Sequence, residues 1–435
     1  MKSSLGITAC SRRASTRMRI LILNEYFYPD VASTAQHSTD LAQALERQGH
    51  EITVVSGRRG YEGGGQSLPG RETWEGIRIC RVSSLGLAKT ARWQRAAHFA
   101  SFLLAAAWRL LWLGSFDAVV AMTTPPLISA LAAAFVWLRG GRLIVWVMDL
   151  NPDEALAAGW LREGSLATRF LENVMGGSLR RADAVAVLDR FMSERLVNKG
   201  VPERKLEVIP PWAHNGAVHY DPEGRKAFRE RHGLDGKFVV MYAGNHSPCH
   251  PLDTLLQAAE RLAENTQIAF CFVGGGSEFI KVKGFAKANG LRNIVCLPYQ
   301  PLGSLSGALS AADLHVAVMG NPFVGIVHPC KIYNIINLGI PFLYIGPPRS
   351  HVVDLLPPGA AGTWAYIAGH GEVDKVVEAI LAAGKCCGVR FEEEAQMGVR
   401  FAQEELIPRM TGLVTGAPAC QATNRPLGVR EEVVE

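Results

Sequence analysis

The sequence predicts an α/β protein made of two Rossmann-like halves, each built on a parallel sheet. Short apolar, β-branched runs alternate with longer helical patterns along most of the chain, which is typical of βαβ units. The pattern then restarts near Lys237, after a stretch rich in Pro and Gly. The 435 residues suffice for two domains of ordinary size.

The first half is expected at residues 18–209. Its predicted strands lie at 19–23, 51–55, 76–82, 117–121, 142–147 and 184–187. A helix is predicted from Thr34 to Gln48, because Gly49 is a typical C-terminal signal. Residues 1–17 are polar and basic and lack the apolar segment of a secretory signal, so we expect them to be a disordered arm.

The second half is expected at residues 236–385, after a linker at 210–235 that contains one helix. Its predicted strands lie at 237–242, 268–273, 293–296, 313–318 and 342–345. A charged amphipathic helix is predicted within 386–414, and the tail at 415–435 is expected to be disordered.

The composition excludes several classes of protein. With 48% hydrophobic residues, 20% charged residues and a net charge of +5, the chain is globular and lacks the basic stripe of a nucleic-acid binder. Its nine cysteines show no CxxC and no zinc-like spacing, so neither a disulfide framework nor a structural metal is expected. These features fit a reducing cytoplasm.

An apolar segment at 96–114 allows three interpretations. It can pack on the sheet, lie in a membrane interface with basic residues 89–95 at the headgroups, or span a bilayer. His98 and Arg109 make spanning costly. We expect contact with a membrane surface through 89–114, which places the protein in the cytoplasm, peripheral on the inner face of the cell membrane.

The segment 323–341 predicts an anion site. A glycine-containing loop leads into a short helix whose N–H groups and dipole favour negative charge. Lys331 lies in the first turn, where a cation opposes the dipole, and this suggests a bound phosphate. The alternative is a surface helix with an incidental lysine.

Other candidate residues follow predicted strands. Asp149 follows one such strand, and a carboxylate in a cleft there can act as a general base. Asp153 and Glu154 come next, but they can instead be favourable acids in the first turn of a helix. Ser33 and Thr34 can hold a phosphate or sugar, or merely cap a helix.

Two histidines, His246 and His250, lie four residues apart in a further loop. Neighbouring prolines argue against a regular helix there, and no third ligand is evident, so we predict no metal site. Phosphate binding by backbone N–H groups, Ser247 and a protonatable histidine is the preferred interpretation.

From Met18 to about Val414 the chain resembles the GT-B glycosyltransferases of the retaining family 4, in the branch acting in bacterial exopolysaccharide and O-antigen assembly. Five parts of the sequence carry the resemblance: the opening strand and loop, Asp149-Leu-Asn-Pro152, the Gly244 loop, the Gly274 loop and His328-Pro-Cys-Lys331-Ile-Tyr333. It implies two Rossmann-like domains facing a central cleft, with the acceptor bound by the first domain and the donor by the second.

The resemblance also implies roles for particular residues. Asp149 and Lys331 would be catalytic, and Ser33 and Thr34 would form an acceptor or phosphate loop. The residues implied in donor binding are Gly244, Asn245, His246, Ser247, Gly274, Gly275, Tyr299, Gln300, His328, Pro329 and Asn334.

The sequence departs from the family pattern at two places. The paired glutamates of the family fall near Ile326 and on Asn334, so both carboxylates are absent. The loop after Gly244 also lacks the usual Arg or Lys.

The resemblance implies a hexosyltransferase that moves a sugar from a nucleotide sugar, with UDP-sugar the first expectation, to a lipid-linked or growing glycan acceptor. No cofactor, metal or nucleic-acid partner is expected. A non-catalytic binding protein of the same fold and a sugar-nucleotide epimerase remain alternatives. A nicotinamide dehydrogenase is disfavoured, because no Gly-x-Gly-x-x-Gly follows the first strand.

Overall fold

The structure is a computed structural model that describes residues 17–30, 32–60, 67–86, 92–212, 218–385, 390–391 and 401–417. The chain forms two compact units, Met1–Ile144 and Val145–Glu435. Their division falls inside a strand and not at 210–235, so the domain boundaries expected from the sequence stay a prediction. Nearly all of the predicted arm and tail, and residues 386–389 and 392–400 of the predicted C-terminal helix, lie outside the described residues.

The prediction of two largely parallel sheets is confirmed. The first sheet has the strand order β3 (Arg71–Trp74), β4 (Ile77–Val82), β2 (Glu51–Gly57), β1 (Arg19–Leu23), β5 (Ala118–Ala121), β6 (Arg142–Trp146), β7 (Ala184–Val187), β8 (Leu206–Val208). The second has the order β11 (Ile294–Leu297), β10 (Ile268–Gly275), β9 (Phe238–Asn245), β12 (Leu314–Val318), β13 (Phe342–Ile345), β14 (Ala365–Ala368). The neighbours of β1 and of β9 are parallel to them.

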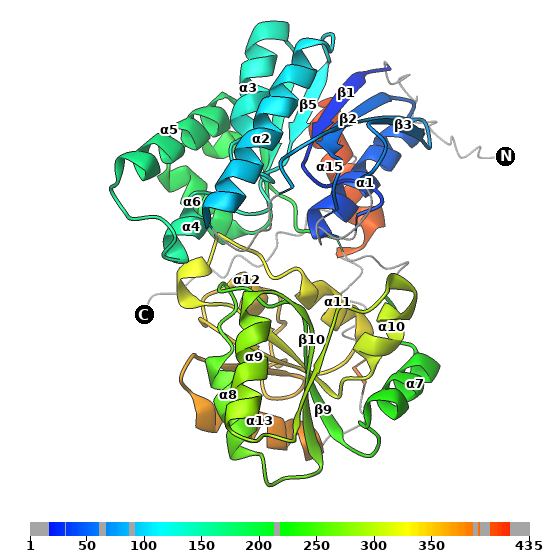
Figure 1. Cartoon of the computed structure of the whole chain (residues 1–435), viewed down its shortest axis with the longest axis vertical. Coiled ribbons are helices and arrows are strands. Elements are labelled where there is room, and N and C mark those ends of the chain that lie inside the picture. Colours follow the sequence, from blue (N-terminus) through cyan, green and yellow to red (C-terminus); the bar gives the residue numbers. More distant parts are fainter. Residues whose placement is uncertain are drawn as a thin grey trace, which may run out of the picture. The chain divides into compact units, whose positions relative to one another are not determined.

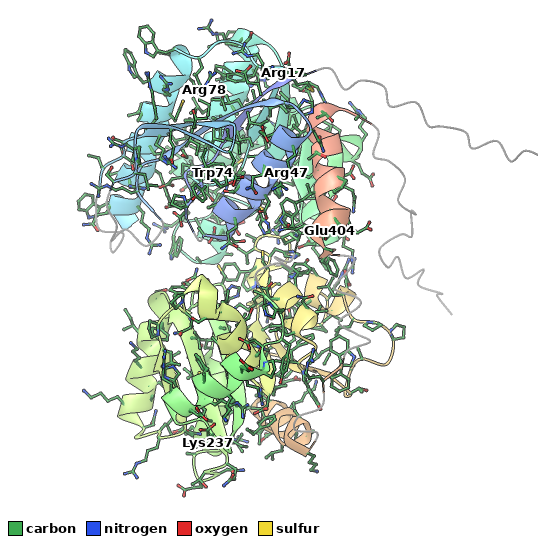
Figure 2. All side chains as sticks on the ribbon, turned by 90° about the vertical axis from the view of Figure 1, so that its right-hand side faces the viewer. Arg17, Arg47, Trp74, Arg78, Lys237 and Glu404 are labelled. Carbon is green, nitrogen blue, oxygen red and sulfur yellow. The ribbon has the colours of Figure 1, made fainter. Side chains whose placement is uncertain are left out.

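The hairpin β3–β4 was not predicted from the sequence. It is antiparallel, and its turn uses positive φ angles at Glu75 (46°) and Gly76 (78°). Trp74 stacks on Tyr28 with ring centroids 3.9 Å apart, which holds the hairpin to the loop after β1. Trp74 and Arg78 mark the two strands of the hairpin in Figure 2. The short strands β8 and β14 were missed as well.

Three helices of the first unit are α1 (Ser33–Arg47), α2 (Arg92–Leu111) and α3 (Ile128–Arg139). The helix predicted at 96–114 is α2, and α3 runs beside it (Figure 1). A buried stripe with a spacing of four residues, His98, Phe102, Ala106 and Leu110, faces the interior. No helix in the described part of the chain is long and apolar enough to cross a bilayer.

The second unit contains the helices α4 (Asp153–Ala157), α5 (Leu166–Arg181), α6 (Arg190–Asn198), α7 (Pro222–His232), α8 (Asp253–Arg261), α9 (Ser277–Ala288), α10 (Leu302–Ser310), α11 (Lys331–Leu338), α12 (His351–Asp354), α13 (Val373–Lys385) and α15 (Gln403–Thr415). The second sheet is buried on both faces. Val240 and Tyr242 of β9 belong to one core with α8, α9 and α13, whereas Val239 and Met241 belong to another with α7 and α10 (Figure 1). This two-sided burial explains the continuous apolar runs of its strands.

Asp313, just before β12, anchors helix α7 to the second sheet. Its carboxylate accepts hydrogen bonds from Arg225 at 2.6 Å, from Arg229 at 2.5 Å and from the N–H of Val239 at 2.7 Å. Lys237 precedes β9 at the end of the strand opposite Gly244 (Figure 2). The end that carries Gly244 holds the candidate site.

Candidate functional site

The glycines predicted to bind the donor lie at the carboxyl ends of two neighbouring strands. Gly244 of β9 and Gly274 of β10 are paired in register, with φ angles of 119° and 134° that favour glycine. A Cβ on Gly274 would lie 2.1 Å from the carbonyl oxygen of Gly244. Glycine is therefore required here for packing between the strand ends. Ligands of parallel α/β sheets bind at this edge.

Lys331 opens α11 and lies over the end of β9. Its Nζ is 3.5 Å from the ring centroid of Tyr242 and 3.5 Å from the point where a Cβ added to Gly244 would lie. The Nζ is buried and has no hydrogen-bond partner, and burial lowers the pKa of Lys331 to about 7. A buried amine without a counter-ion is costly, and an anionic ligand would supply the missing partner.

The first turn of α11 offers fewer free N–H groups than the sequence suggests. The N–H groups of Ile332 and Tyr333 donate to the carbonyl oxygens of Pro329 and Cys330, both at 3.2 Å. The positive charge available at this helix end is therefore chiefly that of Lys331.

His246 and His250 lie close to Lys331, but neither adds positive charge near neutral pH. Burial, helped by the charge of Lys331, lowers the pKa of His246 to about 4 and that of His250 to about 3. The Nδ1–H of His246 donates to the carbonyl of Gly244 at 2.9 Å, and that of His250 donates to Val318 at 2.7 Å. The expected protonated histidine is thus replaced by two neutral imidazoles.

The predicted base Asp149 follows β6 and is electrostatically linked to Glu154. Burial, followed by the negative charge of Glu154, raises the pKa of Asp149 to about 7. The Cys249 thiol lies 3.9 Å from a carboxylate oxygen of Glu154, and its pKa is raised to about 12 by burial and by the charges of Glu154 and Asp149. The second unit therefore brings Asp149 and Glu154 to the loop that carries His246 and His250. A carboxyl group that titrates near pH 7 suits acid–base chemistry.

The remaining predicted donor residues lie around the same strand ends. Tyr299 is 43% exposed, and its hydroxyl donates to Gly275 at 3.4 Å. Gln300 donates to the carbonyl of Pro298, and the Ser247 hydroxyl bonds the Cys249 thiol. Asn334 is half-buried, one turn after Lys331 on α11. Whether these residues bind a donor stays a prediction.

Asp189 belongs to a buried chain of hydrogen bonds that the sequence analysis missed. Its carboxylate caps α6 through the Met192 N–H at 2.8 Å and accepts from Nδ1 of His328 at 2.7 Å. Nε2 of His328 is in turn hydrogen-bonded to the Tyr333 hydroxyl at 2.6 Å. Both nitrogens of the predicted donor residue His328 are thus engaged within the protein. Asp189 follows β7, so the strand-end argument that selected Asp149 could have found it.

Asp189, His328 and His351 are the only described residues whose ligating atoms cluster closely enough to suggest a metal, within 4.8 Å of one another. The imidazoles of His328 and His351 stack at 3.8 Å and 23°, so their in-plane lone pairs run side by side and do not converge. Nδ1 of His328 already bonds Asp189. As arranged here, the cluster suits a hydrogen-bonded brace and not a metal centre.

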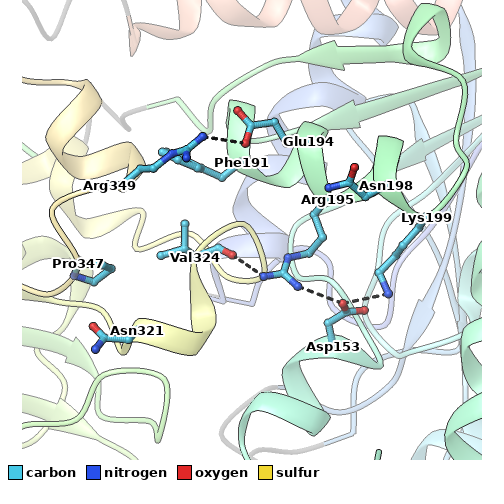
Figure 3. Close-up of a pocket in the computed structure, with 10 residues that line it drawn as sticks. All are labelled: Asp153, Phe191, Glu194, Arg195, Asn198, Lys199, Asn321, Val324, Pro347 and Arg349. Atoms are coloured by element: carbon cyan, nitrogen blue, oxygen red, sulfur yellow. Dashed lines mark hydrogen bonds and ion pairs between the residues drawn. The ribbon is translucent and has the colours of Figure 1, made fainter. Parts of the chain in front are cut away.

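A pocket of about 630 Å³ lies apart from the predicted donor residues, none of which lines it. Figure 3 shows Asp153 between Arg195 and Lys199, at 3.6 and 3.0 Å, and Arg349 paired with Glu194 at 3.6 Å. These pairs offset much of the charge in the pocket. It therefore does not replace the Lys331 region as the candidate site.

The predicted phosphate loop lies in the first unit. Ser33 is the first residue of α1, and the helix has no side-chain N-cap, so the simple capping role considered for this pair is not seen. The carbonyl oxygen of Thr34 accepts from Asn24 at 3.3 Å. Phosphate or acceptor binding by Ser33 and Thr34 stays a prediction.

Comparisons with known proteins agree with the two-sheet architecture. Residues 34–212 match the model of the glycosyl transferase 4-like domain. WcaI of Escherichia coli strain K12, whose name describes a glycosyl transferase of colanic acid biosynthesis, is 24% identical over 339 residues, which are 74% of this chain and 82% of WcaI.

Two solved structures share the fold at low sequence identity. Sucrose-phosphate synthase of Thermosynechococcus elongatus has a TM-score of 0.70 at 15% identity, covering 91% of this chain and 98% of that one. Anabaena HepE, in complex with UDP and glucose, has a TM-score of 0.68 at 15% identity and covers 92% of this chain and 100% of its own.

Proposed function

Because the chain is a glycosyltransferase with the GT-B fold, we propose that it moves a sugar from a nucleotide sugar to a lipid-linked or growing glycan acceptor in cell-surface polysaccharide biosynthesis. The name of WcaI supports the polysaccharide role. The presence of UDP in the HepE complex supports a UDP-sugar donor. The resemblance to the retaining family 4 supports a reaction with retention of configuration.

The observation that carries this proposal is the unpaired amine of Lys331. A nucleotide sugar leaves its sugar as a nucleoside diphosphate, and negative charge grows on the leaving oxygen as the sugar–phosphate bond breaks. Lys331, buried over Gly244 at the strand ends, would stabilise that charge more strongly than a solvated lysine. With this charge in place, no metal ion or cofactor is required.

Asp149 is our candidate for orienting the acceptor hydroxyl or accepting its proton. Its raised pKa near 7 and its link to Glu154 support proton exchange at neutral pH. The glycine-ended strands, with Asn245, Ser247, Tyr299, Gln300 and Asn334 around them, would hold the nucleotide. Because the proposed acceptor is lipid-linked, we also propose that the protein lies at the inner face of the cell membrane and contacts it through residues 89–114.

Transfer assays with a panel of radiolabelled nucleotide sugars and membrane extracts as acceptor source test this function. We expect incorporation of the sugar from one UDP-sugar. The Lys331→Ala substitution should lower the rate of transfer by at least about a hundredfold, since removing one charge-stabilising group typically lowers a rate by this much. Lys226→Ala is the matched control, because this lysine is exposed on α7. Near-normal transfer by Lys331→Ala would remove Lys331 from the mechanism.

The panel also separates the alternatives. Formation of an epimerised nucleotide sugar without acceptor would favour the epimerase. Absence of thermal stabilisation by any nucleoside diphosphate would favour a non-catalytic binding protein.

A further inference from the structure

The pocket of about 630 Å³ lies within the second unit and has no role in the proposed chemistry. Its walls are α6, the first residue of α4 and the loops that follow β12 and β13. We call it the α6 pocket. The donor glycines end β9 and β10 of the same sheet, and β9 lies next to β12. The α6 pocket therefore continues the sheet edge at which such folds bind ligands, and its volume falls in the usual range of about 300–1,000 Å³.

Each cation in the wall of the α6 pocket already has a carboxylate partner. Arg195 and Lys199 both pair with Oδ1 of Asp153, at 3.6 and 3.0 Å (Figure 3). Arg349 pairs with Glu194 at 3.6 Å. A phosphate or carboxylate ligand would have to displace one of these side chains and would meet the negative charge of the other. The charges of the α6 pocket therefore disfavour an anion.

Asp153 keeps an unused capacity to accept hydrogen bonds. The residue is 7% exposed, and its second oxygen, Oδ2, is buried and has no hydrogen-bond partner among the described residues. A buried acceptor that lacks a partner is costly. The torsion that turns a carboxylate is soft, so either oxygen can face a ligand. A hydroxyl in the pocket can thus donate to Asp153 while it accepts from Lys199.

The rest of the wall suits a ligand rich in hydroxyl groups. Figure 3 shows the exposed Asn198 near Lys199 and the exposed Asn321 across the pocket. Each amide offers both donors and an acceptor, as sugar hydroxyls also do. Phe191 and Pro347 add apolar wall for the C–H face of a sugar ring. Paired charges, amides and apolar groups together favour an uncharged saccharide.

We propose that the α6 pocket binds an uncharged sugar unit of the growing glycan acceptor. Its assignment to the acceptor rests on the proposed function, but binding of a saccharide needs neither UDP nor transfer. The pair of Asp153 and Lys199 would recognise hydroxyl groups, and Asn198 and Asn321 would orient the ring. Lys331 does not line the α6 pocket, so the saccharide and the donor diphosphate can be bound together.

Saturation-transfer NMR on the full chain tests this proposal, with the neutral disaccharides maltose, cellobiose, lactose and mannobiose as probes. We expect transfer to at least one of them, unchanged by saturating UDP or by inorganic phosphate at equal ionic strength. Displacement by UDP would place the sugar in the donor site, and displacement by phosphate would show an anion site. Either result, or binding of none of the probes, would overturn the proposal.

Substitutions locate the bound disaccharide. Asp153→Asn should raise its dissociation constant by about tenfold, since a hydrogen bond to a charged group is lost. This substitution also removes the partner of Arg195 and Lys199 and so lowers stability. Asn198→Ala combined with Asn321→Ala leaves these ion pairs intact and should raise the dissociation constant by at least about fivefold.

Asn173→Ala combined with Asn289→Ala is the matched control, because it removes two exposed amides that do not line the α6 pocket. This control should bind the disaccharide as the parent does. Equal binding by the parent and by the variant at Asn198 and Asn321 would contradict the assignment to this pocket.

UDP titrations on the same variants separate this inference from the proposed function. We expect unchanged UDP affinity in all of them. UDP binding by a parent protein that binds no disaccharide would leave the transferase proposal standing and remove the saccharide site. Disaccharide binding without any UDP binding would keep the site and contradict the transferase.

Discussion

At the scale of single residues, Lys331 is placed where it destabilises the fold. Its amine lacks a hydrogen-bond partner, and burial lowers its pKa from the ordinary value of 10.5 to about 7. The unfolded chain therefore binds more protons than the folded one between about pH 7 and pH 10.5. It follows that this group makes the free energy of unfolding rise with pH across that window.

The affinity for UDP should have the opposite pH dependence. A diphosphate favours the charged amine and so raises its pKa, which means that binding near pH 8 takes up a proton. We expect the affinity to fall by up to about tenfold per pH unit above pH 7. Calorimetry in buffers of different ionisation enthalpy measures this uptake, and a flat affinity from pH 7 to pH 9 would contradict it.

Asp189 is a second residue with a perturbed charge. Burial alone would raise its pKa, but the hydrogen bond and charge of His328, with that of His351 and the N–H of Met192, lower it to about 2. The folded pKa lies below the unfolded value of 3.8. The stability that Asp189 contributes is therefore present above about pH 4 and lost as the pH falls towards 2.

Asp189→Asn should lower the free energy of unfolding by about 3–5 kcal/mol, because it removes the negative charge from a buried pair with His328. Urea titrations at neutral pH measure this, and the variant should also lack the parent's loss of stability between pH 4 and pH 2. Glu194→Gln, in an exposed ion pair, is the control and should change stability by less than about 1 kcal/mol. Equal effects of the two substitutions would contradict a bracing role for Asp189.

Part of this site can be predicted from the sequence and part cannot. Gly244 and Gly274 could be placed together, because each ends a strand of the same parallel sheet and the carboxyl ends of such strands meet at one edge. The bond between Asp189 and His328 could not be placed, because 139 positions separate them and only tertiary packing joins them. The neutral state of His246 was missed for the same reason, since its burial arises from contacts outside its own loop.

At the scale of elements, helix α7 depends on Asp313. Two arginines of α7 and a strand N–H converge on this carboxylate, whose side chain is 2% exposed. Asp313→Asn should lower the free energy of unfolding by about 3–5 kcal/mol, because two partly buried guanidinium groups lose their counter-charge. Denaturant unfolding measures the effect.

Glu230→Gln is the control for this element. Glu230 pairs with Lys226 at 3.8 Å on the exposed side of α7, where an ion pair contributes about 0–0.5 kcal/mol. A loss of similar size in both variants would show that the anchor of α7 lies elsewhere.

The strands around Asp313 were predictable from their apolar runs, whereas the hairpin β3–β4 was missed because it rests on a two-residue turn and on stacking with Tyr28.

At the scale of the whole molecule, the parallel sheets were predictable because strands buried on both faces leave continuous apolar runs in the sequence. The roles at the strand ends depend on charges set by burial, which a sequence does not show. The chain carries its one unpaired buried lysine, among the described residues, at the sheet edge where such folds bind ligands. This coincidence is the basis of the transferase mechanism proposed here.

The most direct test is calorimetric titration of UDP into the parent protein and into Lys331→Met. Methionine fills a similar volume without charge, so the ligand-free variant should unfold at an equal or higher denaturant concentration. We predict that UDP affinity falls by about tenfold to a hundredfold, as expected for loss of a charge-assisted contact. Unchanged UDP affinity in a stably folded Lys331→Met protein would contradict the placement of the donor diphosphate at Lys331.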